Sequence, residues 1–341
     1  MNLTFKRFVA LCGSTMALVL LSSAAYAEKP DTDESKSNLA QAKEKNTSLI
    51  LLGTAGGPII QSYRSQPASL IIVNGKRFLI DCGEGTVRQL ARIGYGPEAV
   101  STVFLTHLHF DHTAGLASLL AFDWAGSKSR PIDIYGPPGT DGLVEAAVGY
   151  FSIPVGIFKP LLKRPELRQL ASSHSVDVVE PTVIYEDKDL TVTAVENSHY
   201  DAVRISPQPY GTPRSYSYRF KTKDRTIVFT GDTGPSEAVT RLASDADILV
   251  SEVIDIKQAM IDAQARGGSA EGIAAVIAHQ RKEHLTPQEV GKMATAAKVK
   301  MVVLSHLAFA RDSEGQAANF IEGVRETYSG PLIAGRDLDE F

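Results

Sequence analysis

Histidine and aspartate are concentrated in one short stretch of the chain, in the order His-x-His-x-Asp-His. The stretch consists of His107, His109, Asp111 and His112. Side chains alternate along an extended backbone, so His107 and His109 are expected to point to one side, while Asp111 and His112 face a second point where the chain turns. Imidazole and carboxylate groups are ligands for zinc, and less often for iron or manganese. The pattern therefore favours two neighbouring metal ions that share one loop.

The elements around this stretch place it at the end of a strand. Residues 103–105 are apolar and predict a buried strand, and residues 113–125 predict the start of a helix. Further acidic or imidazole side chains follow other apolar runs directly or closely: Asp81, His199, Asp232, Glu252 and His306. An aspartate in such a place is often only a helix N-cap. A lone histidine there is usually structural, so these positions become candidate metal ligands only because the central stretch is also present.

The motifs resemble those of the metallo-β-lactamase superfamily, whose dinuclear hydrolases carry the signature of residues 107–112. The segment Asp-Cys-Gly-Glu-Gly-Thr at 81–86 is similar in particular to the tRNase Z and arylsulfatase branch, and the similarity covers nearly all of residues 49–341. It implies an α/β fold, a four-layer αββα sandwich of two similar halves with metals at the strand ends along one edge. One fold hosts many chemistries, so the functional expectation depends on the ligand set.

The resemblance also implies the ligands of two Zn²⁺ ions, with iron or manganese as alternatives. The expected ligands of the first ion are His107, His109 and His199. Those of the second are Asp111, His112 and His306. Asp232, in a Gly-Asp-Thr motif, is expected to bridge both ions, and Asp81 and Glu252 are expected to orient ligands from behind. Such a set leaves room for a shared water molecule.

Catalysis also needs a proton for the leaving group, because an alkoxide leaves poorly. His284 is the candidate general acid, since the tRNase Z branch carries a catalytic histidine in a similar His-x-Thr segment. Thr286-Pro287 predicts the start of a helix that would hold His284 just before its N-terminus, although a solvent-exposed loop histidine is the alternative. We expect Asp111 to take part in catalysis too, and we leave His174 and His279 as surface or helix residues.

The expected activity is hydrolysis of a small-molecule sulfate or phosphate ester, as in arylsulfatases. Phe110 stands where tRNase Z enzymes usually have glycine, and no Gly-Pro-rich arm for clamping tRNA is found. A nucleic acid partner is therefore not expected. The alternatives are a cyclic-nucleotide or nucleic-acid phosphodiesterase, a lactone or β-lactam hydrolase, and a non-catalytic metal-binding or partner-binding module. B1 β-lactamases have cysteine at the position of Asp232, which weakens the β-lactamase alternative.

The N-terminal region has the features of a cleavable signal peptide over residues 1–27. Lys6 and Arg7 precede an apolar run, and Ala25-Tyr26-Ala27 fits a cleavage site after Ala27, with a retained anchor as the alternative. Residues 28–48 are polar and predict a disordered linker, so the hydrolase domain is expected over 49–341. We therefore expect a periplasmic or secreted protein without a stable membrane anchor.

Charge and cysteine content narrow the remaining choices. The formal net charge is −4, and cleavage would remove Lys6 and Arg7 and make it −6, which argues against a surface dedicated to polyanions. Cys82 would be the only cysteine left after cleavage, so no internal disulfide can form, and we expect it to be buried rather than a metal ligand.

Two further segments leave alternatives open. Residues 53–58 are rich in glycine but lack the spacing and the lysine of a P-loop, so a tight turn beside the site is expected. Residues 152–175 interleave prolines with apolar and basic side chains, which fits a lid, a surface arm, an oligomer contact or an ordinary apolar excursion. The sequence leaves the oligomeric state open, a dimer included.

Overall fold

The computed structural model describes residues 46–126, 130–203, 205–309 and 314–341. The expected signal peptide and nearly all of the expected linker lie outside these ranges and stay predictions. The first strand, β1, begins at Thr47, so the last two residues of the expected linker belong to the folded domain.

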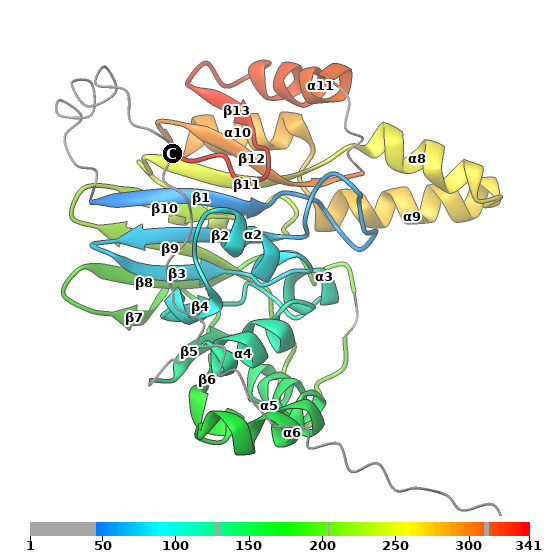
Figure 1. Ribbon diagram of the computed structural model, residues 1–341. Helices are drawn as coiled ribbons and strands as arrows, with labels where there is room; N and C mark the ends of the chain where they lie inside the picture. Colours follow the sequence, from blue (N-terminus) through cyan, green and yellow to red (C-terminus); the bar gives the residue numbers. More distant parts are fainter. Residues whose placement is uncertain (1–45, 127–129, 204, 310–313) are drawn as a thin grey trace, which may run out of the picture. The chain divides into compact units, whose positions relative to one another are not determined.

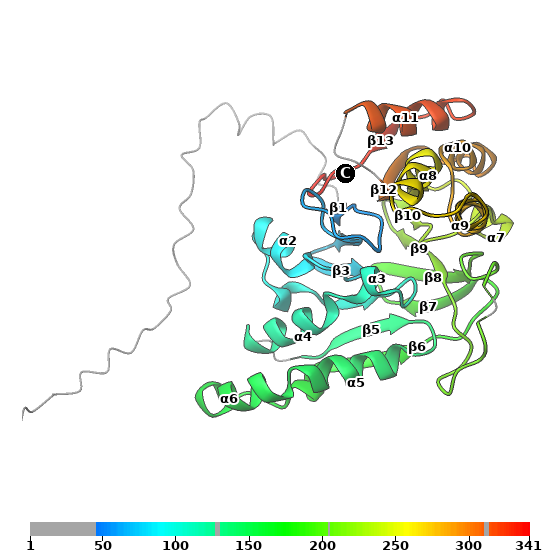
Figure 2. The same ribbon diagram turned by 90° about the vertical axis from the view of Figure 1, so that its right-hand side faces the viewer.

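Two mixed β-sheets form the framework (Figures 1 and 2). The first sheet has the strand order β1-β2-β3-β4-β5-β6, with bounds β1 Thr47–Gly53, β2 Ala68–Val73, β3 Lys76–Ile80, β4 Thr102–Phe104, β5 Ile132–Gly136 and β6 Ala171–Ser175. The second sheet has the order β13-β12-β11-β10-β9-β8-β7, with bounds β7 Thr182–Glu186, β8 Leu190–Glu196, β9 Tyr216–Thr222, β10 Thr226–Phe229, β11 Ile248–Ile254, β12 Val302–Ala308 and β13 Leu332–Ala334. Each sheet has parallel strands on one side and antiparallel strands on the other.

Helices cover the outer faces of both sheets. Those of the N-terminal half are α2 Thr86–Arg92, α3 Phe110–Thr113, α4 Leu116–Ala125, α5 Thr140–Tyr150 and α6 Ser152–Leu162, with 3₁₀ turns at Pro97–Ala99 and Leu167–Leu170. Those of the C-terminal half are α7 Glu237–Leu242, α8 Ile256–Ala265, α9 Ala270–Glu283, α10 Pro287–Ala296 and α11 Glu314–Arg325. One apolar cluster joins the first sheet to α2, α4 and α5, and another joins the second sheet to α7, α10 and α11. The expected αββα sandwich is therefore confirmed.

The two sheets meet through an aromatic core that also anchors the histidine-rich loop. Phe104 of β4 stacks on Tyr135 and meets the edge of Phe220 of β9, both at 5.3 Å between ring centroids. Next to this contact, the buried Tyr218 hydroxyl donates to the Leu105 carbonyl at 2.6 Å. Burying one such aromatic ring stabilises the fold by about 1.5 to 3 kcal/mol. The second sheet thus fixes the start of the loop that the first sheet carries.

The segment 152–175 forms helix α6, a 3₁₀ turn and strand β6. Helix α6 forms despite Pro154 and Pro160. Val155 is the one buried residue of this helix. None of the candidate metal ligands lies on it. Over the described residues, no single helix has the length and apolar character to span a membrane; α5 and α6 reach that mark only when counted together across a 62° bend.

Candidate metal centre

The strands bring the predicted metal ligands to one end of the two sheets. Asp81 follows β3, residues 107–112 follow β4, and His199 follows β8 after a short turn. In the second sheet, Asp232 follows β10, whereas His306 lies inside β12 rather than after it. Parallel strands point their carboxyl ends the same way, which explains why residues so distant in sequence converge.

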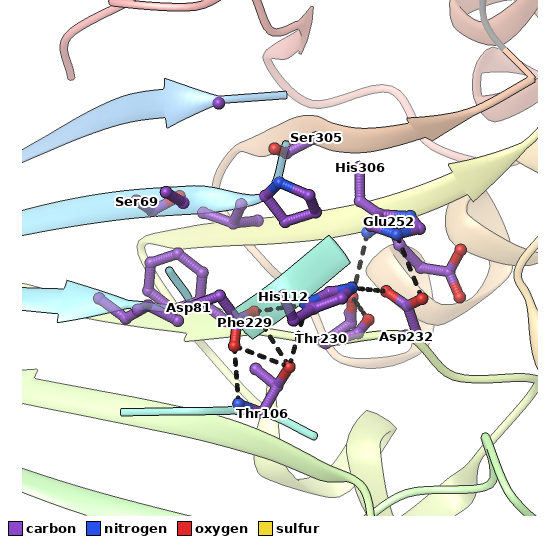
Figure 3. A pocket seen from close by; sticks show the side chains of 16 residues that line it. Ser69, Asp81, Thr106, His112, Phe229, Thr230, Asp232, Glu252, Ser305 and His306 are labelled. Atoms are coloured by element: carbon purple, nitrogen blue, oxygen red, sulfur yellow. Dashed lines mark hydrogen bonds and ion pairs between the residues drawn. The ribbon is translucent and has the colours of Figure 1, made fainter. Parts of the chain in front are cut away.

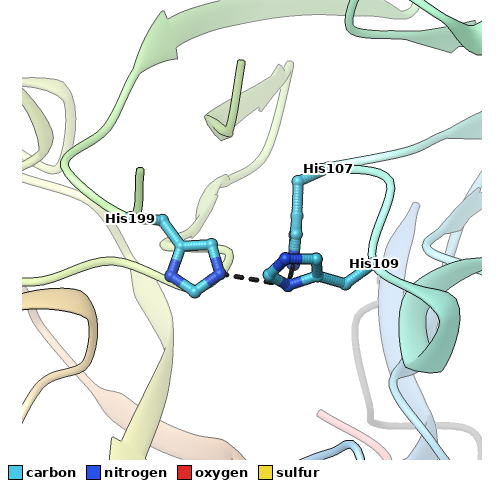
Figure 4. Close-up of side chains that lie close together, drawn as sticks. All are labelled: His107, His109 and His199. Carbon is cyan, nitrogen blue, oxygen red and sulfur yellow. Dashed lines mark hydrogen bonds between the residues drawn. The ribbon is translucent and has the colours of Figure 1, made fainter. Parts of the chain in front are cut away.

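Three imidazoles form the group that we call the first triad: His107, His109 and His199 (Figure 4). Nδ1 of His109 lies 3.0 Å from Nε2 of His107 and 3.3 Å from Nε2 of His199. Tyr200 packs its ring against His109 and His199, at 5.4 and 5.1 Å between centroids. A neutral imidazole carries one N–H, so three ring nitrogens that face one another this closely cannot all form hydrogen bonds with each other. One cation between them would bind all three.

A second triad contains Asp111, His112 and His306. Nε2 of His112 and Nε2 of His306 each lie 3.5 Å from Oδ2 of Asp111. Asp232 lies between the two triads: its carboxylate is 3.4 Å from Nε2 of His112 and 3.9 Å from Nε2 of His107. Figure 3 shows His112, Asp232 and His306 converging in the pocket behind the strand ends.

Several buried polar atoms of this group lack a hydrogen-bond partner among the described residues. They are Nε2 of His112, Oδ1 of Asp232 and both ring nitrogens of His306. Leaving a buried polar atom unpaired costs about 1 to 3 kcal/mol, so an arrangement that does this four times has another purpose. Divalent cations coordinated by these atoms would remove the cost. The donor set therefore fits the metal ions that the sequence predicts.

Behind the ligands, hydrogen bonds fix which nitrogen faces the site. Oδ2 of Asp81 lies 2.9 Å from Nδ1 of His112, and Thr106 donates its backbone N–H to Oδ1 of the same carboxylate at 2.8 Å. Nδ1 of His199 donates to the Glu283 carbonyl at 3.0 Å. In both histidines, Nε2 is then left free to bind a metal. Asp81 adopts a positive φ of 58°, a strained conformation for a residue with a side chain, and such strain is concentrated at functional sites.

His284 completes the site from a third side. It follows α9 directly and precedes α10, whose N-cap Thr286 forms a capping box with Glu289, as the sequence predicts for the start of this helix. Nδ1 of His284 lies 2.9 Å from Oε2 of Glu252. A ring nitrogen of His284, a ring nitrogen of His199 and a carboxylate oxygen of Asp232 lie within 4.8 Å of one another. The alternative of a solvent-exposed loop histidine is wrong, because His284 is buried.

Burial and neighbouring charge keep the first triad neutral. Burial lowers the pKa of His107 well below its ordinary value and that of His199 to about 3; the other imidazoles lower both further, while Asp232 only partly opposes the shift. The pKa of His109 is lowered in the same way. Neutral imidazole is the form that binds metals, so this triad is held ready for a cation.

The second triad is charged instead. Burial disfavours the charged form of His112, but Asp232, Asp81 and Asp111 outweigh it and raise the pKa of His112 well above its ordinary value. The pKa of His306 is raised too, chiefly by Asp232 against burial. In return, His112 and His306 outweigh burial and hold the pKa of Asp111 at about 2. These carboxylates require positive charge nearby, which protons or a metal ion can supply.

Sequence reasoning missed Thr106, and it expected the glycine-rich turn beside the site without naming the residue that Gly57 approaches. Thr106 contacts both Asp81 and His107, with its hydroxyl 3.1 Å from Nδ1 of His107. A side chain at Gly57 would place its Cβ 1.8 Å from Oδ2 of Asp111, so the glycine-rich turn beside the site closes directly on a predicted ligand. Only the glycine run carried a signal for this, because the approach of a distant loop is not encoded locally.

The other residues considered from sequence lie away from the centre. His174 is on β6, paired with Asp133 at 2.9 Å, and His279 is on α9, paired with Glu283 at 2.9 Å. Cys82 is buried, and burial raises the pKa of its thiol to about 12. A thiol that keeps its proton is a poor metal ligand, in agreement with its expected packing role.

The fold and this site define a hydrolase of the metallo-β-lactamase class. A sequence model described as "Beta-lactamase superfamily domain" matches residues 76–307, and the chain belongs to this superfamily. The expectation of a metal-dependent hydrolase that acts on ester bonds is thereby confirmed.

Individual relatives narrow the comparison. A ribonuclease Z from Mycobacterium bovis is 29% identical over 300 residues, which cover 85% of this chain and 96% of that enzyme. A ribonuclease Z from Methanothermobacter thermautotrophicus is 28% identical over 283 residues, which cover 76% of this chain and 86% of that enzyme. The crystal structure of the short form of human tRNase Z superposes with a TM-score of 0.60 at 22% identity, over 86% of this chain and 98% of that one.

Two expectations from the sequence are wrong. The two relatives described above match along most of the chain and are ribonucleases Z, so an arylsulfatase-like enzyme for small sulfate or phosphate esters is not the activity that they indicate. The expectation that a nucleic acid partner is absent fails for the same reason, since the substrate of these relatives is RNA. The net charge and Phe110 were weak grounds for excluding a nucleic acid partner, because a site can bind one strand locally without a basic surface over the whole molecule.

Proposed function

We propose that this protein is a zinc-dependent phosphodiesterase that cleaves nucleic acid. The observation that carries the proposal is the convergence of two triads on Asp232, in a chain that aligns with ribonuclease Z over 300 residues. The shared chemistry of that enzyme class is attack of water on a phosphodiester. Iron and manganese remain alternatives to zinc, which metal analysis of the purified protein would decide.

In this proposal the first triad holds one cation and the second triad holds the other, with Asp232 as a ligand of both. When bound, such a pair of cations polarises the phosphate oxygens and lowers the pKa of the attacking water. Asp111, which we also expect from the sequence to take part in catalysis, contributes by binding the second cation. The buried carboxylates need this positive charge, and the neutral imidazoles of His107 and His199 are in the form that accepts it.

His284 is proposed to donate the proton that the leaving oxygen requires. Burial lowers its pKa, but Glu252 at 2.9 Å outweighs burial and raises the pKa of His284 to about 9, so the ring is protonated at neutral pH. Glu252 is itself fixed, because its Oε1 accepts the backbone N–H of Thr233 at 2.7 Å. A protonated and immobile imidazole is suited to serve as a general acid.

The test is hydrolysis of bis-p-nitrophenyl phosphate and of a labelled single-stranded RNA by the zinc-loaded protein. Asp232→Asn is expected to abolish turnover of both substrates and to lower bound zinc measured by mass spectrometry. Glu237→Gln is the matched control, because Glu237 is an exposed carboxylate whose one ion pair lies on the surface of α7. If the zinc-loaded wild-type protein cleaved neither phosphodiester, the proposed function would be wrong.

A further inference from the structure

The candidate site opens to solvent at one of its histidines. His107, His112, His199, His284 and His306 are all buried, whereas His109 is exposed. The next residue, Phe110, has 63% of its surface exposed. Because Phe110 lies between an exposed site histidine and Asp111, it stands at the mouth of the site and not on a remote surface.

Other exposed apolar side chains lie on the loop that approaches Asp111. Gly57 lies against Asp111, and Ile59 and Ile60, two and three residues further along that loop, are 47% and 60% exposed. A single exposed apolar residue needs no explanation, but exposed apolar residues on both of the segments that meet at a functional site favour binding of an apolar group.

Among the described residues of three loops near this opening, 54–67, 105–115 and 197–215, positive charge is scarce. The arginines among them are Arg64 and Arg214. Arg64 donates to the Thr54 hydroxyl and to the Gly335 carbonyl. The guanidinium of Arg214 binds Asp177 and Glu196. A duplex is held mainly by several Lys and Arg contacts to its phosphates, and the described residues of these loops do not offer such a row.

We propose that Phe110 is a stacking platform for a nucleobase beside the cleaved phosphodiester, so that the substrate must present an unpaired base. This inference rests on the proposed function. Phe110 adjoins Asp111 in the chain, so a base on its ring belongs to a nucleotide next to the phosphate in the site. The face of a base in a duplex is covered by its neighbours, whereas an unstacked base of a single strand offers its face to an aromatic side chain.

The test uses three substrates with zinc-loaded protein: a short single-stranded RNA, the same strand with abasic riboses on both sides of the cleaved bond, and the fully paired duplex. Phe110→Ala is expected to lower kcat/KM on the intact strand by about 10-fold or more, the range of one lost base stack, and to leave the abasic strand unchanged. Phe110→Trp should retain activity. Phe122→Ala, which removes a 55% exposed phenylalanine from α4, is the matched control and should behave as wild type.

A binding measurement separates this inference from the proposed function. The zinc-loaded His284→Asn protein, which lacks the proposed general acid but keeps both triads and Asp232, is titrated with fluorescent intact and abasic strands, with and without Phe110→Ala, and dissociation constants are read from anisotropy. The platform predicts about a 10-fold preference for the intact strand that Phe110→Ala removes. Equal binding of the two strands by the zinc-loaded His284→Asn protein, or an equal loss on both caused by Phe110→Ala, would overturn the stacking role even if the wild type cleaves RNA. Absence of cleavage with a Phe110-dependent preference would instead overturn only the proposed function.

Discussion

The two triads differ in charge, in exposure and in what holds them. The first consists of three imidazoles, of which His109 is exposed. Burial lowers the pKa values of all three histidines. The second contains a carboxylate, is buried throughout, and its histidines have raised pKa values because carboxylates surround them. A buried site with an anionic ligand binds a divalent cation more firmly than an exposed neutral one, because charge attraction is stronger away from water.

The difference suggests separate tasks. The first triad, through its exposed His109, lies at the opening, where Phe110 and the arriving substrate would meet it, whereas the second triad is buried throughout and lies between Asp81 and Asp232. We expect the second triad to keep its metal during turnover and during purification. We expect the first to exchange its metal with solvent more readily.

The largest effect is expected at the residue that the two triads share. Asp232→Asn removes the negative charge that lies 3.4 Å from His112 and 3.2 Å from His306. We predict a loss of phosphodiesterase activity of more than about 100-fold, beyond what loss of an orienting partner usually causes. Bound zinc should fall at both triads. Retention of two zinc ions per chain by Asp232→Asn would contradict the bridging position.

A matched pair of substitutions compares the triads directly. His306→Ala opens a buried position and removes the positive charge that lies 3.5 Å from Asp111 and 3.2 Å from Asp232, so it should lower the free energy of unfolding of the metal-free protein by more than about 1 kcal/mol. His109→Ala removes an exposed ring and should change it by less than about 0.5 kcal/mol. Urea denaturation after treatment with chelator measures both. Each variant should also lose one equivalent of zinc; equal destabilisation by the two variants would remove the distinction in burial.

The means of orienting ligands gives a third comparison. A side chain, Asp81, holds His112, while a backbone carbonyl, that of Glu283, holds His199. Asp81→Asn should therefore weaken zinc binding at the second triad by about 10- to 100-fold and leave the first triad unchanged. Competition with a chromogenic chelator resolves the two dissociation constants. If both constants changed together, the triads would not be independent.

The smallest predicted effect concerns pH. His284 keeps its proton below its raised pKa of about 9 and loses it above that value, so a general acid at this position fails on the alkaline side. Glu252→Gln removes the charge that raises this pKa, and the alkaline limb of the rate profile should move to lower pH. We expect kcat at neutral pH to fall by about 10-fold, within the range for general acid catalysis, with zinc content unchanged. A limb that stays in place would exclude His284 as the proton donor.

Local signals predicted the parts of the site that local structure determines. Thr286-Pro287 indicated the start of α10, and the capping box with Glu289 places it there. The His-x-His-x-Asp-His spacing, together with the apolar residues 103–105, predicted a turn from strand to helix after β4 that carries four site residues. The helix begins earlier than the expected residue 113, because α3 starts at Phe110 and includes Asp111 and His112. These patterns involve residues within one turn or one strand, which is the range over which sequence periodicity carries information.

Long-range packing determined what the sequence could not predict. His306 was expected after a strand, but β12 continues to Ala308 because it pairs with β11 beyond a bulge. Helix α6 forms with Pro154 in its first turn, where no N–H is needed, and it continues past Pro160, which lies inside the helix. The substrate could not be predicted either, because it depends on side chains around the opening of the site, which come from separate loops.

The division of the ligands between the two sheets also constrains how the protein matures. His112 belongs to helix α3, which follows β4 of the first sheet, and His306 belongs to β12 of the second, which comes late in the chain. During synthesis the second triad cannot exist until both sheets have formed and packed, and such non-local pairing is slow. Metal capture at that triad would then come only after the two sheets have packed, so a shortage of the metal would affect the finished site rather than the order in which the sheets form.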